Sequence, residues 1–103
     1  MSEDRLLKEI DRGQKAKAVL DNPVFLDTIQ ALRDSAVREM VSAPNDDIER
    51  VRLAKMCHTV TEAFVKRLIH HMQTGEMATT ELDRLRTEQE RSRDRYRRPR
   101  RVA

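Results

Sequence analysis

The longest stretch of the chain without proline or glycine runs from Asp46 to Gln73, and it predicts one long helix. At a rise of 1.5 Å per residue, roughly 27 residues make a helix about 40 Å long. Asn45 is suited to cap its start, and the carboxylates of Asp46 and Asp47 complement the helix dipole in the first turn. Gly75 predicts its end, because glycine readily takes the left-handed conformation that closes helices.

Apolar residues recur along this helix at spacings of three and four, so they share one face. That face comprises Leu53, Cys57, Val60, Phe64, Leu68 and His71, with Cys57 expected to be a small buried residue. Isolated helices gain little stability in water, so such a one-sided helix needs other helices over its apolar side. We therefore predict a helix-packing or oligomer face made by Phe25, Ile29, Leu32, Met40, Leu53, Val60, Phe64 and Leu68.

Two shorter helices are predicted before the long helix. Ser2 caps the first, in which Gly13 is expected to be a point of close helix contact or a weak spot. Asn22 and Pro23 end that helix and start a second one over residues 23–41. The connection to the long helix is short, which predicts an antiparallel hairpin with the two phenylalanines near each other.

After Gly75, Thr80 followed by Asp83 has the outline of a capping box and predicts a short fourth helix. The predicted fold class is therefore all-α: an antiparallel helical hairpin, with helices at about 23–41 and 46–73. It is covered by an N-terminal helix and followed by the fourth helix and a basic C-terminal tail. Residues 1–85 form the helical domain, and residues 86–103 form an Arg-rich tail that we expect to be solvated or disordered without a partner.

Charge is distributed unevenly between these two regions. Residues 91–101 hold seven arginines and one aspartate, a net +6, while the whole chain carries +3, so the remainder carries −3. Arginine donates paired hydrogen bonds to phosphate and carboxylate, and tyrosine stacks on bases. The tail could bind nucleic acid, dock on an acidic protein or only keep the chain soluble; its candidate binding residues are Arg91, Arg93, Arg95, Tyr96, Arg97, Arg98, Arg100 and Arg101.

Other kinds of site find little support in the sequence. His58, His70 and His71 cannot converge on one ion from a single helix, so we expect no metal site. No glycine-rich phosphate loop or nucleophile motif is present, which predicts a non-enzyme without cofactors or a small-molecule substrate. No stretch resembles a signal peptide or a membrane span, and the lone cysteine agrees with a reducing compartment, so we expect no membrane partner and a reducing, cytosolic setting.

Three segments and one leucine resemble a group of small helical proteins of tailed bacteriophages that are encoded near the terminase and portal genes. The segments are residues 15–25, 46–53 and 74–78, and the leucine is Leu32. The similarity covers most of residues 5–85. The resemblance implies a role in virion assembly or DNA packaging, and with it a location in a virion or a host cytoplasm, but it supplies no catalytic residues. The basic tail beyond residue 90 does not match that group.

The sequence thus leads to three hypotheses. The first is a non-catalytic virion component, a helical adaptor or accessory protein that binds other phage structural proteins or itself as a homo-oligomer. The second is a DNA-binding packaging protein of the small-terminase kind, in which a helical oligomer presents the arginines to DNA. The third is a host-directed inhibitor that folds its tail onto a host protein.

Overall fold

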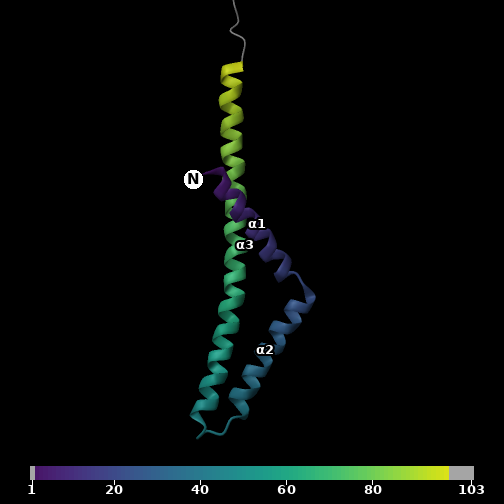
Figure 1. Cartoon of the computed structure of the whole chain (residues 1–103), viewed down its shortest axis with the longest axis vertical. Helices are drawn as coiled ribbons and strands as arrows, with labels where there is room; N and C mark the ends of the chain where they lie inside the picture. Colours follow the sequence, from purple (N-terminus) through teal and green to yellow (C-terminus); the bar gives the residue numbers. More distant parts are fainter. Residues whose placement is uncertain (1, 98–103) are drawn as a thin grey trace, which may run out of the picture.

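The computed structural model describes residues 2–97, which form three helices and no strand. Helix α1 spans Glu3–Leu20, α2 spans Pro23–Ser42 and α3 spans Ile48–Arg97 (Figure 1). The predicted all-α class is confirmed. The molecule is elongated, with principal extents of 92 × 24 × 18 Å, because α3 alone runs nearly its whole length.

The first two helices begin where the sequence predicts. The Ser2 hydroxyl accepts a hydrogen bond from the backbone N–H of Arg5 at 3.3 Å. The Asn22 side chain accepts from the N–H of Val24 at 2.9 Å, and Pro23 occupies the first turn. These side chains satisfy backbone donors that a helix start leaves without partners.

The third helix begins later than predicted. Its first residue is Ile48, and the Asp47 carboxylate accepts from the backbone N–H of Arg50 at 3.1 Å, which makes Asp47 and not Asn45 the capping residue. The cause is a turn in the connection, closed by a 2.9 Å hydrogen bond from the Asp47 N–H to the Pro44 carbonyl. This turn uses residues that the sequence alone assigned to the helix.

Gly75 does not end the helix, so the predicted short fourth helix was wrong. α3 continues through it to Arg97, and no described glycine has a positive φ angle. The hydroxyls of Thr79 and Thr80 donate to the carbonyls of Gly75 and Glu76 one turn earlier, so Thr80 lies inside a helix rather than capping one. The 86–97 part of the Arg-rich region is the last part of α3.

α1 packs against the later half of α3 and barely touches α2, which corrects the prediction that it covers the hairpin. Figure 1 shows α1 crossing α3 obliquely above the level of α2. The contact is centred on Leu6, which is only 1 % exposed among Ala78 and Leu82, with Ile10 and Leu85 packed around them. The physical reason is that the continued α3 carries its own apolar residues beyond Gly75, and α1 covers these.

α2 and the first part of α3 lie side by side and run in opposite directions (Figure 1). The rings of Phe25 and Phe64 are 6.1 Å apart, as the short connection predicts. Phe64 is nevertheless 54 % exposed, so it lies at the surface instead of filling the core. The reason is that α2 packs against Ala54 and Thr61 of α3. These lie one position later in sequence than the exposed Leu53 and Val60, whose row includes Phe64.

Candidate docking surface

α3 carries two parallel rows of residues at spacings of three and four. The inner row faces α2 and α1, and its members are all buried or half-buried: Ala54, His58, Thr61, Val65, Leu68, Met72 and Gly75. The outer row lies one position earlier in sequence and consists of Leu53, Cys57, Val60 and Phe64. A shift of one residue rotates a position by about 100° around a helix, so the two rows point in adjacent directions.

The outer row is exposed. Leu53 is 59 % exposed, Val60 67 % and Phe64 54 %, and Cys57 is exposed as well. The prediction that Cys57 is buried was therefore wrong. Ala54, one turn earlier, occupies the position against α2 instead. Isolated exposed apolar side chains are ordinary in proteins, but a contiguous row is typical of an interaction surface.

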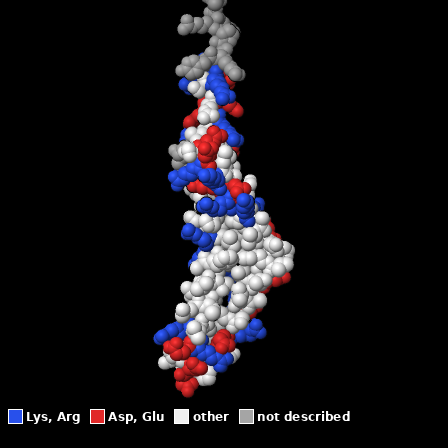
Figure 2. All heavy atoms as spheres, in the orientation of Figure 1, with Lys and Arg blue, Asp and Glu red and all other residues white. Residues whose placement is uncertain are grey.

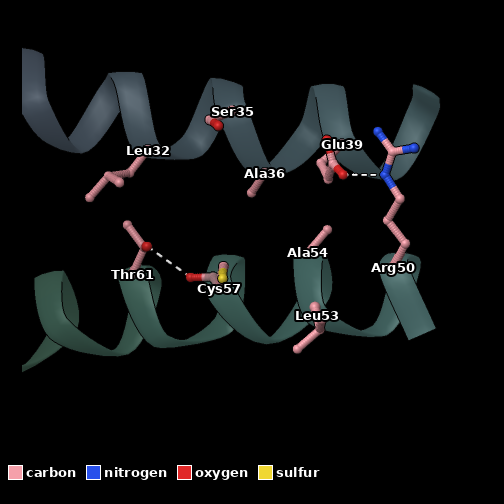
Figure 3. A pocket seen from close by; sticks show the side chains of 9 residues that line it. All are labelled: Leu32, Ser35, Ala36, Glu39, Arg50, Leu53, Ala54, Cys57 and Thr61. Carbon is pink, nitrogen blue, oxygen red and sulfur yellow. Dashed lines mark hydrogen bonds and ion pairs between the residues drawn. The ribbon is translucent and has the colours of Figure 1, made fainter. Parts of the chain in front are cut away.

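A groove of about 310 Å³ separates the outer row from α2. Leu32, Ser35, Ala36 and Glu39 line it from α2, and Arg50, Leu53, Ala54, Cys57 and Thr61 line it from α3 (Figure 3). The groove exists because most of these side chains are small, so the two helices leave space between their exposed edges. Leu32 is 50 % exposed and points from α2 towards Thr61 on the other side of the groove (Figure 3).

The groove contains one pair of opposite charges. Glu39 and Arg50 form an ion pair at the end near the helix connection (Figure 3). The hydrogen bond from Arg50 holds the pKa of the Glu39 carboxyl below its ordinary value. A second pair, Arg33 with Glu62, joins α2 and α3 with a 3.2 Å bond from Arg33 Nη2 to Glu62 Oε2, and it lowers the pKa of Glu62 in the same way.

Charged side chains are unevenly distributed over the molecule. Figure 2 shows a broad area without charged side chains over the middle of the molecule, between the charged helix connection and the charged later part of α3. We call the exposed side of the α2–α3 pair the apolar face, and define it by Thr28, Leu32, Ser35, Leu53, Cys57, Val60 and Phe64. Its only charged groove residues neutralise each other.

The residues predicted to pack differ in their exposure: some are buried between α2 and α3, and others lie at the exposed edge of these two helices. Ile29 is buried, and Phe25, Met40 and Leu68 are half-buried. Leu32, Leu53, Val60 and Phe64 are at least half exposed and belong to the apolar face. Whether those four pack against another chain stays a prediction. The sequence reasoning missed Ala54 and Thr61, although their spacing continues the inner row and could have identified them.

The predicted Arg-rich site lies on the projecting end of α3. Arg91, Arg93 and Arg95 are exposed, Tyr96 and Arg97 belong to the same helix, and Arg98, Arg100 and Arg101 lie outside the described residues. In a helix, Arg91 and Arg95 are one turn apart on one side, while Arg93 lies about 200° away on the other. The structure therefore divides these arginines between two sides of the helix.

Within residues 2–97, no group of three or more His, Cys, Asp or Glu side chains is placed to hold a metal ion. None of the helices in that range is long and apolar enough to cross a membrane. Comparison of the chain with protein-family models, with curated proteins and with solved structures found no match.

Proposed function

We propose that this chain is a non-catalytic assembly protein, an adaptor or accessory subunit that binds helical partners through its apolar face. The observation that carries the proposal is the exposed outer row of α3 beside the small-residue groove. A row of this kind costs free energy in water and is stabilised when another apolar surface covers it. The bacteriophage resemblance favours a virion as the setting, with other structural proteins or further copies as partners.

The surface area supports an assembly role. The chain exposes 8754 Å², whereas a compact monomer of the same mass would expose about 6,000 Å². The difference is roughly 2,700 Å² for one chain, while both partners of an obligate complex together bury about 2,000–5,000 Å². Part of it belongs to the projecting end of α3 and part to the apolar face.

A second candidate function is DNA binding during packaging, and the exposed arginines at the end of α3 favour it. A basic helix that projects away from the helical body can approach a duplex without obstruction by the rest of the chain. Each arginine that neutralises a phosphate releases counterions, so such binding would weaken steeply with salt. In this function the apolar face would hold the oligomer together and the arginines would contact the phosphates.

Duplex-DNA binding across a salt series distinguishes the two functions. The proteins to compare are the full-length chain, a chain truncated after Glu90, and two double variants, Arg91→Gln/Arg95→Gln and Arg93→Gln/Arg97→Gln. The two double variants remove equal charge from opposite sides of the helix, so each is the control for the other.

Packaging requires that the full chain bind with a steep negative salt slope and that the truncated chain not bind. Unequal loss in the two double variants would identify the side of the helix that meets the duplex. Absence of binding by the full chain at moderate salt would contradict the packaging function and leave the adaptor function, in which the arginines meet an acidic protein surface. In that case the protein should remain with purified particles in a fixed copy number.

A further inference from the structure

Both helices of the α2–α3 pair carry an exposed row of residues beside the row through which they contact each other. On α3 the inner row packs against α2 and α1, while the outer row beside it is exposed. On α2, Ile29 and Ala36 face α3, while Leu32 lies in an adjacent exposed row between two small hydroxyl residues, Thr28 and Ser35, at spacings of four and three. Each helix thus presents two neighbouring rows, of which one has a partner.

Two adjacent rows per helix are typical of a four-helix bundle. Each helix in such a bundle contacts two neighbours, so it needs an apolar stripe wider than the single row that serves a two-helix contact. The α2–α3 pair supplies two helices, and within residues 2–97 no other helix lies over the apolar face, because α1 packs on the later half of α3. A four-helix bundle would need two further helices of matching length.

We propose that a second copy of this chain supplies them, and that two α2–α3 pairs stack apolar face to apolar face into a four-helix bundle. The inference rests on the proposed assembly role and identifies the partner of its surface. In the dimer, Leu53 and Val60 of each copy enter the space between the helices of the other, where the small side chains Ser35, Ala36 and Ala54 form the groove.

Charge favours a second copy over a charged partner. A two-fold interface brings identical surfaces together, so any net charge on them would repel itself. The charged pair in the groove, Glu39 with Arg50, is internally neutral, and no other charged residue lines it. A strongly acidic or basic partner would find no complementary charge there, whereas an identical copy meets no repulsion.

The whole exposed side of the α2–α3 pair is needed for a dimer interface. The residues that define the apolar face cover about 18 Å of it, from Leu53 to Phe64, whereas the twenty residues of α2 make that side about 30 Å long and two helices make it about 20 Å wide. The full outline is about 600 Å² before the relief of the side chains is added, below the roughly 800 Å² per partner of a standard stable interface. The projecting end of α3 and α1 lie outside this outline and remain free for other contacts.

The test is the mass of the full-length protein in solution, measured by light scattering and sedimentation at several concentrations. The wild-type chain is expected to be a dimer. Val60→Glu places a charge in the outer row and is expected to give a monomer, because a carboxylate buried in an apolar interface is strongly unfavourable. Met77→Glu is the matched control: Met77 is 73 % exposed on the same helix but away from the apolar face, so this variant should stay dimeric.

Circular dichroism and thiol reactivity separate dissociation from unfolding. Val60 is exposed in the single chain, so Val60→Glu should keep its helical signal, and Val60→Ser provides a milder second variant that should weaken the dimer without a buried charge. Cys57 is the only cysteine and lies in the outer row. A thiol reagent should therefore modify it slowly in the wild-type dimer and faster in Val60→Glu.

A wild-type monomer at tens of micromolar would overturn the proposal, as would a stoichiometry other than two or a Val60→Glu protein that remains dimeric. These outcomes are separate from the DNA-binding test. A monomer that binds DNA through its arginines would refute the bundle alone, and a dimer that binds no DNA would refute the packaging function alone.

Discussion

Gly13 of α1 and Gly75 of α3 meet where the two helices cross, with their backbones in direct contact. A Cβ atom on Gly13 would lie 2.8 Å from the Gly75 Cα and 3.0 Å from the His71 carbonyl oxygen. A Cβ on Gly75 would lie 2.8 Å from the Gly13 Cα. The two glycines of this chain are therefore paired with each other, and each lets the other helix approach closely.

We expect Gly75→Ala to destabilise the protein, although alanine favours helix by about 1 kcal/mol over glycine. The clash is with backbone atoms that cannot rotate away, and overpacking of this kind costs about 1–3 kcal/mol. Urea denaturation at fixed protein concentration measures the change. Ser92→Ala, at an exposed position of the same helix, is the control and should be neutral or slightly stabilising. A gain in stability from Gly75→Ala would show that the two helices do not touch there.

Two adjacent leucines of α1 should differ sharply in their effect on stability. Leu6 is 1 % exposed in the cluster with Ala78 and Leu82, whereas Leu7 is 44 % exposed. Leu6→Ala should lower the free energy of unfolding by about 2–5 kcal/mol, because it removes buried methyl groups and leaves a cavity. Leu7→Ala should cost about 0.5 kcal/mol, as at ordinary surface sites. Chemical denaturation of both variants checks this, and equal losses would contradict the placement of α1.

Acidification should weaken the protein through His71. Its pKa lies below the ordinary value of 6.5 because of burial and the positive charges of Arg67, Arg12 and His70. The folded state therefore binds a proton less readily than the unfolded chain, and stability is lost as pH falls below about 6.5 towards the lower folded pKa. Thermal unfolding between pH 7.5 and 5 should show this loss in wild type and a smaller one in His71→Gln. His70→Gln, at an exposed position, is the comparison: it removes only the smallest of the causes that lower the His71 pKa, so it should keep most of the wild-type dependence.

The Arg33–Glu62 pair should stabilise the α2–α3 contact at neutral pH and lose this contribution in acid. The pKa of Glu62 is held below its ordinary value of 4.5, first by the hydrogen bond from Arg33. A carboxyl with a lowered folded pKa contributes stability that is complete above pH 4.5 and is lost as pH falls through the folded pKa. Glu62→Gln should lower the unfolding midpoint modestly at pH 7, and this effect should shrink as the pH falls through the folded pKa of Glu62.

Glu49→Gln is the comparison for that variant. Glu49 pairs with Arg52 within one helix, and both side chains are more than half exposed. Solvent screens such pairs strongly, so Glu49→Gln should change the midpoint less than Glu62→Gln at pH 7. If the two substitutions had the same effect, the pair between α2 and α3 would not contribute to their contact.

The sequence by itself determined the helices and two of their starts. Ser2 and Asn22 supply side-chain acceptors beside their own helix, so these caps depend on local contacts that a short segment contains. The absence of proline and the three-and-four spacing made the long helix evident. The sequence also indicated that Gly13 could mark a close helix contact, which the structure places opposite Gly75.

Only the tertiary structure decided what Gly75 does and which row of α3 faces inward. Glycine can end a helix or admit a neighbouring backbone, and the choice depends on whether another helix lies against it, which no local pattern states. Likewise, Leu53 and Ala54 lie on adjacent rows, and hydrophobicity alone favours Leu53 for the interior. Close packing of α2 instead places the small Ala54 inside and leaves Leu53 exposed, because two helices approach most closely where side chains are small.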